Sequence, residues 1–311
     1  MQALTQLFFI ILNVIVNHDV VFKLIGLANK RRHWLKAVFV TYPNSEKIAS
    51  RFAPRWLFGY LKWRPYFLGP FEQGGVWGLK FVISSFPHEL STSDNKSNRR
   101  ELLDRMEYLR RITGAEKILF GFGIGAALRG DRPKDAQGQL LVSADDAFVA
   151  AQAAVLAAQQ VRERHGLDGA PVIFLATRSM IERIDKYLKI SGGLTAIMIN
   201  PQERNKPEFV WPTELRDRQV VLISLVKEDN LLTLRGRLGS SWIIVNEAYL
   251  KDPDDFVSKL GRPKGIPVYQ LCGARGRTFP DPPGIYYGSM PCCQVISPMN
   301  MEVVVREIKP S

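Results

Sequence analysis

The stretch PVIFLAT at residues 171–177 decides the fold, because it is the first of five short apolar runs that alternate with helical patterns. Apolar runs of about four to eight residues without polar alternation are typical of strands buried on both faces. The other runs are LTAIMI (194–199), QVVLISLV (219–226), SWIIVN (241–246) and PVYQLC (267–272). Helices are predicted between them at 178–190, near 229–237 and at 253–260. The alternation predicts a Rossmann-like α/β domain with a mostly parallel sheet.

The region upstream of this series adds helices and a strand of its own. Residues 144–164 are rich in alanine and predict a helix with Ser143 as its N-cap. A further helix is predicted at 99–112, closed by Gly114, and a strand at 117–120. The helix at 99–112 rests on the spacing of Leu102, Leu103, Met106, Leu109 and Ile112. We therefore expect a smaller N-terminal α/β domain at residues 1–142 and the Rossmann-like domain at 143–311.

Positive charge is concentrated near the N-terminus. The 311 residues carry a formal net charge of +12. Between Val20 and Tyr66, Glu46 is the only acid among ten basic residues. These are Lys23, Lys30, Arg31, Arg32, Lys36, Lys47, Arg51, Arg55, Lys62 and Arg64. Such a patch attracts lipid headgroups, nucleic acid or an acidic protein, although a solvated face without a partner has the same composition. Nucleic acid ranks lowest, since no helix-turn-helix, RNP or zinc motif accompanies the charge.

The apolar run LFFIILNVIV at residues 7–16 is too short to cross a bilayer, which needs about 20 apolar residues. A buried first helix or strand is the favoured interpretation. Interfacial anchoring stays open, because the run continues as a broken apolar stretch into NKRRHWLK at 29–36 and aromatic residues follow it. No secretory signal fits, and the odd count of three cysteines indicates no disulfide framework. We expect a cytoplasmic protein, with peripheral membrane attachment as one possibility.

Two glycine or turn segments are candidates for binding a dinucleotide. The turn ATRSMIER at 176–183 follows the first strand of the sheet, where a Rossmann protein binds pyrophosphate at a helix N-terminus. It has no glycine, yet Thr177, Arg178 and Ser179 offer hydroxyls and a guanidinium; the alternative is a structural turn in which Thr177 or Ser179 caps the helix. Gly121, Gly123 and Ala126 formally match G-x-G-x-x-A, but close packing of two segments explains those glycines equally well.

Cys292 and Cys293 stand beyond the last strand of the series, in GSMPCCQV at 288–295. A cysteine thiolate attacks a thioester to form an acyl-enzyme, which a hydride donor reduces to an aldehyde. The alternative is a pair of buried, unreactive thiols that act as small apolar side chains.

Several segments resemble the long-chain fatty acyl-(acyl-carrier-protein) reductase family. They are FKLIGLA (22–28), FLGPFEQGGVWGLKFVISSFPHEL (67–90), RRITGAEKILFGFGIG (110–125), IIVNEAYLKDP (243–253), VYQLCGARG (268–276) and SMPCCQV (289–295). The resemblance implies NADPH as cofactor, a carrier-bound fatty acyl thioester as substrate and Cys293 as nucleophile, with Cys292 beside it.

One departure qualifies what the resemblance implies. The family's glycine-rich NADPH turn falls on residues 176–182, where this chain has no glycine. Two hypotheses follow. The first is a reductase that binds an acidic acyl carrier protein or an anionic membrane surface. The second is a non-catalytic relative that binds a membrane or a protein partner through its N-terminal region.

Overall fold

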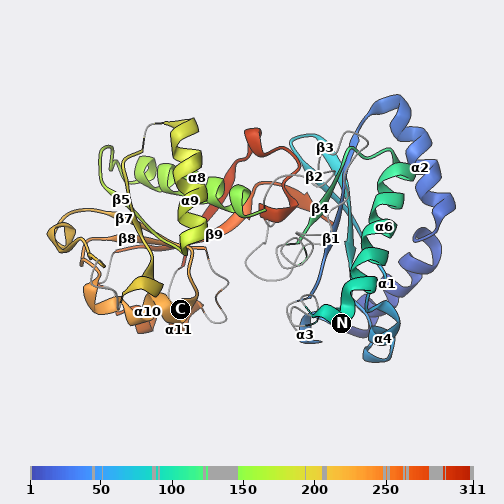
Figure 1. The fold of residues 1–311 in the computed structure, drawn as a ribbon, viewed down its shortest axis with the longest axis horizontal. Coiled ribbons are helices and arrows are strands. Elements are labelled where there is room, and N and C mark those ends of the chain that lie inside the picture. Colours follow the sequence, from blue (N-terminus) through green and yellow to red (C-terminus); the bar gives the residue numbers. More distant parts are fainter. Residues whose placement is uncertain are drawn as a thin grey trace. The chain divides into compact units, whose positions relative to one another are not determined.

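The computed structural model of the chain forms two compact units (Figure 1). It describes residues 2–43, 46–50, 52–85, 89, 92–121, 124, 146–192, 194–204, 209–247, 250, 253–261, 263, 266–279, 290 and 292–308. The first unit contains Met1–Asp146, Gly276–Pro282 and Cys293–Asn300, and the second contains Ala147–Arg275, Pro283–Cys292 and Met301–Ser311. The chain therefore returns twice to its first unit after the boundary near residue 146.

The second unit is built on a six-stranded, mostly parallel sheet, as the apolar runs predict. Its strands are β5 (Val172–Leu175), β6 (Ala196–Ile199), β7 (Val221–Ser224), β8 (Ile243–Asn246), β9 (Val268–Ala274) and β11 (Val303–Glu307). Their order is β11-β9-β8-β7-β5-β6, and only the edge strand β11 runs antiparallel to its neighbour. The α/β class and the parallel sheet are confirmed.

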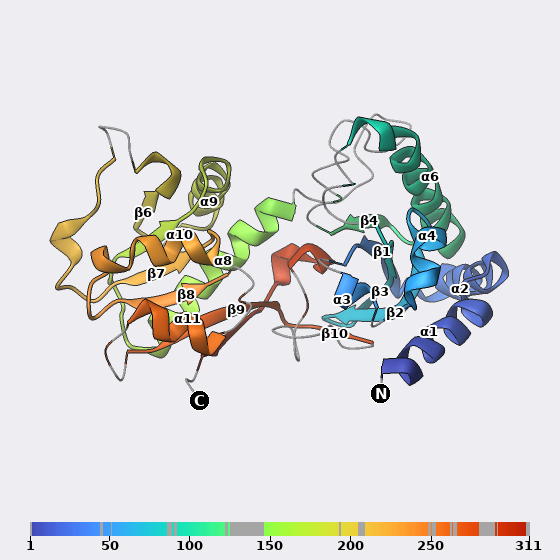
Figure 2. The same cartoon turned by 90° about the horizontal axis from the view of Figure 1, so that it is seen from below.

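Helices cover both faces of this sheet (Figures 1 and 2). They are α8 (Asp146–Arg164), α9 (Arg178–Ser191), α10 (Glu228–Thr233) and α11 (Pro253–Leu260). On one face, side chains from β5, β7, β8 and β9 form a buried core with Leu231 of α10 and Phe256 of α11. On the other, α8 and α9 meet through an edge-to-face contact of Phe148 with Tyr187, whose ring centroids are 6.0 Å apart.

The first unit has a mixed five-stranded sheet of order β10-β2-β3-β1-β4. Its strands are β1 (Leu35–Thr41), β2 (Tyr66–Gln73), β3 (Val76–Val82), β4 (Lys117–Phe120) and β10 (Arg277–Thr278). β1 runs parallel to β3 and β4, whereas β2 and β3 form an antiparallel hairpin. Gly74 and Gly75 make its turn with φ of 58° and 84°, which two-residue hairpin turns require. The strand predicted at 117–120 is confirmed as β4.

The main helices of the first unit pack on its sheet. The described helices are α1 (Gln2–Val16), α2 (Asp19–Arg32), α3 (Glu46–Ala49), η1 (Arg55–Leu57), α4 (Phe58–Leu61), η2 (Ser93–Asn95) and α6 (Lys96–Thr113). The predicted pattern of α6 is confirmed, with Leu102, Leu103, Met106 and Leu109 buried and Gly114 closing the helix at φ 66°. The run at 7–16 is helical, and one of its sides packs on the sheet through Phe9.

Close backbone contact fixes α2 on α6. A Cβ placed on Gly26 would lie 1.9 Å from the carbonyl oxygen of Ile112, so only glycine fits there. One turn further on, the buried Asn29 amide donates to the carbonyl oxygens of Leu35 and Gly114 at 3.0 and 2.8 Å, and its oxygen accepts the Leu35 amide at 2.8 Å. At the other end of α2, Asp19 pairs with Arg105 of α6 at 2.8 Å.

The second segment that returns to the first unit, Cys293–Asn300, is held by two polar side chains. Gln73 Oε1 accepts the backbone amides of Ile296 and Ser297 at 2.6 and 3.0 Å. The Lys117 ammonium donates to the Ile296 carbonyl at 2.7 Å. The expected division into residues 1–142 and 143–311 therefore differs from the structure, in which part of the C-terminal region belongs to the first unit. The two units are also of comparable size, whereas we expected a smaller N-terminal domain.

We predict that Gly26→Ala lowers the free energy of unfolding by about 1–3 kcal/mol, because the added methyl group forces α2 away from α6. Gly59→Ala is the matched control. It lies in α4, where a Cβ meets nothing within 4 Å, and should be neutral or stabilising. Urea denaturation of both variants measures the difference. Equal unfolding midpoints for the two variants would refute the close contact.

Candidate functional site

The expected cofactor turn lies at the C-terminal end of β5. In chain order the five parallel strands are arranged 2-1-3-4-5, and the direction of the connections reverses between β5 and β7. In open α/β sheets, ligands bind outside the carboxyl ends of the strands at such a reversal. Thr177 is extended, with φ −69° and ψ 157°, and α9 begins at Arg178. Thr177, Arg178 and Ser179 therefore occupy the position in the sheet where a ligand is expected.

The side chains of this turn are mostly open to solvent. The Thr177 and Ser179 hydroxyl oxygens lie 3.5 Å apart, and Thr177 makes no capping hydrogen bond to α9. The Arg178 side chain is 80% exposed, with a long contact of 3.7 Å to Glu182. The first amides of a helix lack acceptors within the helix, so an anion placed here would meet two hydroxyls, a guanidinium and free N–H groups.

The glycine cluster has a packing role at the one position that the structure describes. Gly121 follows β4, and a Cβ there would lie 2.8 Å from Thr41 Oγ1 and 3.3 Å from Thr41 Cα. Its amide donates to the Val40 carbonyl at 2.8 Å. Gly121 is thus small because the ends of β1 and β4 approach closely. Gly123 and Ala126 lie outside the described residues.

The segment that carries the two cysteines begins beside the second sheet. Met290 and Ala274 exchange two backbone hydrogen bonds of 2.8 Å at the C-terminal end of β9. A 3-10 helix, η7 (Cys292–Gln294), follows, with Cys292 half-buried. The unit boundary falls between Cys292 and Cys293, and the side chain of Cys293 lies outside the described residues. β9 is three strands away from β5, or about 14 Å at the usual strand spacing.

A row of buried polar side chains, which the sequence reasoning missed, crosses the C-terminal end of the second sheet. Strand register places Ser224, Asn246 and Gln270 side by side on β7, β8 and β9. All three are buried, and Asn246 Nδ2 donates to Gln270 Oε1 at 3.0 Å. The Ser224 hydroxyl has no hydrogen-bond partner among the described residues. Part of the signal was available, because the apolar run SWIIVN ends with Asn246, whereas Ser224 lies inside the run QVVLISLV.

Beside this row, Glu247 follows β8. Burial raises the pKa of its carboxyl above the usual range. Among the described residues, no group of three or more His, Cys, Asp or Glu side chains is placed to hold a metal ion. The described chemistry at this edge is therefore that of hydroxyls, amides and one carboxyl.

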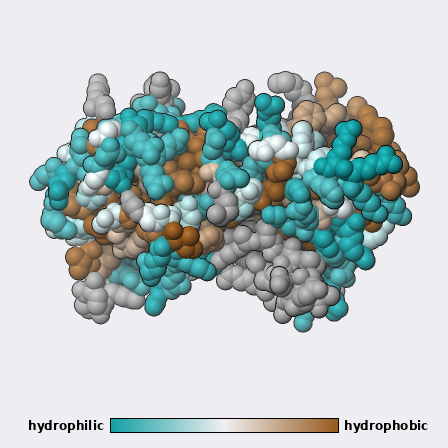
Figure 3. Space-filling view, turned by 90° about the horizontal axis from the view of Figure 1, so that it is seen from above, coloured by the Kyte–Doolittle hydropathy of each residue, from teal (hydrophilic) through white to brown (hydrophobic). Residues whose placement is uncertain are grey.

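Most of the exposed large apolar side chains of the described surface lie on the outer sides of α1 and α2 (Figure 3). α1 contains no charged residue, and its inner side is held by Phe9, which is buried. We name the outer sides the α1–α2 face, and each of its side chains is at least 44% exposed. It consists of Leu4, Leu7, Phe8, Ile11, Val14, Ile15, Val20, Leu24 and Leu27. Trp56 and Tyr60, which are also exposed, lie on η1 and α4.

The length and composition of α1 and α2 bear on whether these helices could cross a bilayer. Among the described residues, no single helix is long and apolar enough to cross one. The pair Ala3–Val16 and Asp19–Arg32 meets that test together, with a bend of 71° between its helices.

Basic side chains border the α1–α2 face. Lys30, Arg31 and Arg32 occupy the last turn of α2, and none of them forms a salt bridge within the described residues. Helical spacing continues the stripe of Val20, Leu24 and Leu27 to Arg31. Other members of the basic stretch are neutralised locally. Lys36 pairs with Glu116, Arg55 with Glu46 and Lys62 with Glu89.

Comparison with known proteins gives no family for this chain. Neither protein-family models nor curated proteins match it. Among solved structures, two crystal structures of full-length LpoA from Haemophilus influenzae align with TM-scores of 0.33 and 0.35 at 9% and 13% identity, over 84% and 86% of this chain. A LacI-type transcriptional regulator from Bacteroides fragilis aligns at 0.30 and 9% identity, over 76% of this chain and 84% of its own. The chain spans about half the length of LpoA.

The thiols of the two described cysteines should differ in reactivity. Burial raises the pKa of Cys272, which is 2% exposed, and the nearby Arg306 offsets this only partly. At neutral pH a raised pKa leaves less thiolate, so we expect iodoacetamide to modify Cys292 about tenfold or more faster than Cys272. Mass spectrometry of timed samples measures both rates, with urea-unfolded protein as the control in which the rates converge. Equal rates in the folded protein would contradict the burial of Cys272.

Proposed function

We propose that this protein acts at the surface of an anionic membrane, to which it binds through the α1–α2 face. The observation that carries the proposal is the outer side of α1, a helix without a charged residue whose inner side already packs on the sheet. Contiguous apolar patches larger than a few hundred Å² mark interaction sites on proteins. The occupant of this face must therefore be apolar itself.

A bilayer meets that requirement. Complete burial of a leucine, isoleucine or phenylalanine side chain contributes about 1.5–3 kcal/mol, so insertion of only three such side chains contributes on the order of 5 kcal/mol. Trp56 and Tyr60 on η1 and α4 are amphipathic side chains of the kind that prefer the headgroup layer. The face thus matches both layers of a membrane interface.

The charge beside the face favours anionic lipid. Each Lys or Arg near a negatively charged membrane surface contributes about 1 kcal/mol, and this attraction weakens as salt is added. Lys30, Arg31 and Arg32 also complement the negative C-terminal end of the α2 dipole, which is their structural role without a membrane. An acidic acyl carrier protein would engage the basic residues, but it would leave the apolar stripe of α1 exposed.

The packing of the two helices favours an orientation in the plane of the membrane. Phe9 of α1 and Phe22 of α2 are fully buried, and they belong to core clusters of the first unit. Insertion of the pair as a bent span would remove both side chains from these cores. An interfacial position keeps them buried and places only the outer sides in lipid.

We predict that the triple variant Ile11→Ser, Ile15→Ser, Leu24→Ser loses about tenfold or more of its affinity for vesicles that contain phosphatidylglycerol. Co-sedimentation at low and high salt measures binding. The wild-type protein should bind more weakly at high salt, since its basic residues contribute, and should retain part of its affinity through the apolar contacts.

Ile190→Ser is the matched control, because Ile190 is 70% exposed on α9, which belongs to the second unit. It should bind as the wild type does. Vesicle binding by the triple variant at wild-type affinity, or no binding by the wild type, would refute the membrane proposal. Binding to an acyl carrier protein without any binding to vesicles would replace the lipid with a protein partner.

As a second candidate, we propose the reductase activity that the sequence resemblance implies. The supporting observation is the position of Thr177, Arg178 and Ser179 at the C-terminal end of β5, where the connections of the sheet reverse. NADPH would place its phosphates there, close to the Arg178 guanidinium. By the same resemblance, the acyl thioester would form on Cys293, with Cys292 as its neighbour.

Titration with NADPH tests this candidate. Saturable binding in the micromolar range is expected, and Arg178→Ala should weaken it about tenfold, because a charge-assisted contact to phosphate is removed. Lys189→Ala, an exposed cation at the opposite end of α9, is the control and should leave binding unchanged. A Cys293→Ser variant should no longer form an acyl adduct visible by mass spectrometry. Absence of NADPH binding to the wild type would eliminate the reductase and leave membrane binding untouched.

A further inference from the structure

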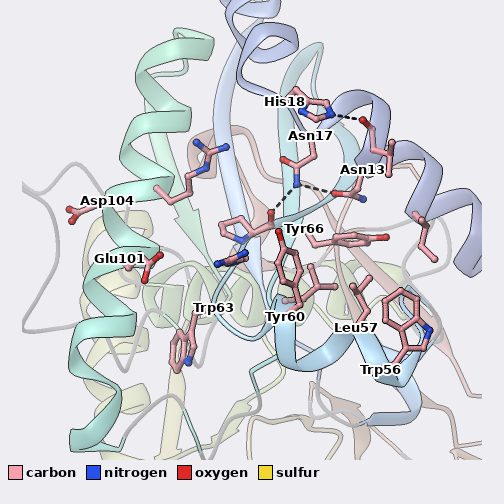
Figure 4. A pocket seen from close by; sticks show the side chains of 16 residues that line it. Asn13, Asn17, His18, Trp56, Leu57, Tyr60, Trp63, Tyr66, Glu101 and Asp104 are labelled. Atoms are coloured by element: carbon pink, nitrogen blue, oxygen red, sulfur yellow. Dashed lines mark hydrogen bonds between the residues drawn. The ribbon is translucent and has the colours of Figure 1, made fainter.

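The first unit contains a cavity of about 740 Å³ beside the α1–α2 face (Figure 4). Its volume lies within the range of about 300–1,000 Å³ found for small-molecule sites. Residues of α1, η1, α4 and α6, together with the chain that enters β2, form its walls. Val14 of the α1–α2 face and the exposed Trp56 and Tyr60 also line it, so the cavity opens onto the surface that we assign to the membrane.

One part of the wall is apolar and aromatic. Ile10 and Val14 of α1 line it together with Leu57, Leu61 and four aromatic side chains. These are Trp56, Tyr60, Trp63 and Tyr66 (Figure 4). Such a wall suits a hydrocarbon chain, and aromatic faces also attract quaternary ammonium groups.

The α6 side of the cavity is charged. Glu101 and Asp104 project from α6, and no salt bridge within the described residues engages either carboxylate. Arg105 is already bound to Asp19. Arg64 also lines the cavity, and its guanidinium lies 4.4 Å from the centroid of the Tyr60 ring. The cavity therefore presents two carboxylates and one available guanidinium, which complement a head carrying both a positive and a negative charge.

Two buried polar atoms in the wall have no hydrogen-bond partner among the described residues. They are the Tyr66 hydroxyl and the Trp63 indole nitrogen. Burial raises the pKa of the Tyr66 phenol to about 12, and the nearby Asn13 side chain offsets this only in part. The Asn13 amide is itself occupied by the backbone of Phe67 at 2.7 and 2.8 Å. Both atoms are inaccessible from the cavity, so they belong to the packed layer behind its surface.

The wall is fixed before any ligand enters. Asn13 pairs with the Phe67 backbone, and Asn17 donates to the Pro65 carbonyl at 3.1 Å. These two asparagines tie α1 to the start of β2, on either side of Tyr66. A preformed site loses less conformational entropy on binding than a site that must be ordered.

We propose that this cavity binds a single-chain zwitterionic phospholipid, with its acyl chain along Ile10, Val14 and Leu57, and its headgroup between the α6 carboxylates and Arg64. The proposal rests on the membrane function proposed above and extends it, because it names a lipid that the protein takes out of the surface on which it sits.

The test is calorimetric titration of the full chain with lysophosphatidylcholine below its micelle concentration and without vesicles. We expect one saturable site. Leu57→Trp fills the apolar wall and should weaken binding about tenfold or more, while Glu101→Gln with Asp104→Asn should weaken binding of this probe without weakening that of a free fatty acid. Tyr66→Phe should leave binding unchanged, because the hydroxyl that it removes is buried behind the cavity surface.

Tyr66→Phe is therefore a control for a change in the wall. Its hydroxyl has no hydrogen-bond partner among the described residues, so its removal should leave the melting temperature unchanged or raised, and vesicle binding unchanged. The variant Ile11→Ser, Ile15→Ser, Leu24→Ser contains no residue of the cavity wall and should keep the lysolipid site while it loses vesicle binding. The proposal is overturned if the wild type does not bind the lysolipid. It is equally overturned if that triple variant loses the probe while Leu57→Trp retains it.

Discussion

The Asn29 side chain is the interaction on which the architecture of the first unit depends. Its amide satisfies backbone groups at the start of β1 and the end of α6, and it does so from the last turn of α2. Because buried backbone groups need partners, this one side chain joins three elements. Gly26, one turn earlier, allows the close approach that the bonds require. The outward side of α2 is set by this contact, and the α1–α2 face is therefore a fixed surface.

The local sequence pattern was sufficient to predict the strands and helices of the second unit, but it was insufficient for the first unit. In the second, continuous apolar strands alternate with helices, and the helices at 178–190 and 253–260 appear as α9 and α11. In the first, the Gly74-Gly75 turn indicates a hairpin and could have been found. The return of Gly276–Pro282 and Cys293–Asn300 to the first unit could not be found in this way. It depends on the pairing of β10 with β2 and on bonds of Gln73 and Lys117 to a segment far along the chain.

The local sequence pattern likewise located some residues of the candidate site and missed others. Thr177, Arg178 and Ser179 were placed at a strand end by pattern alone, and they lie where the sheet reverses. Ser224 and Asn246 show that register, which no single strand reveals, decides which polar side chains become neighbours. Gly121 is the opposite case, since it matches the G-x-G-x-x-A motif in the sequence. In the structure, Thr41 packs where a side chain at this position would lie. The role of a glycine follows from what it faces, and that information is tertiary.

The two sides of α1 bear on whether the apolar run at 7–16 serves only as core or also as the membrane contact proposed above. A core helix surrounded by protein is apolar all round, and a surface helix of a water-exposed domain carries polar residues outward. α1 fits neither description, because Phe9 is buried while Leu4, Leu7 and Ile11 are exposed without a charged neighbour on the helix. Asn13 of α1, and Asn17 just beyond its end, bond to the backbone of Phe67 and Pro65. Amides bonded to protein and apolar side chains turned outward are expected of a helix that lies on lipid, and this arrangement supports the membrane proposal.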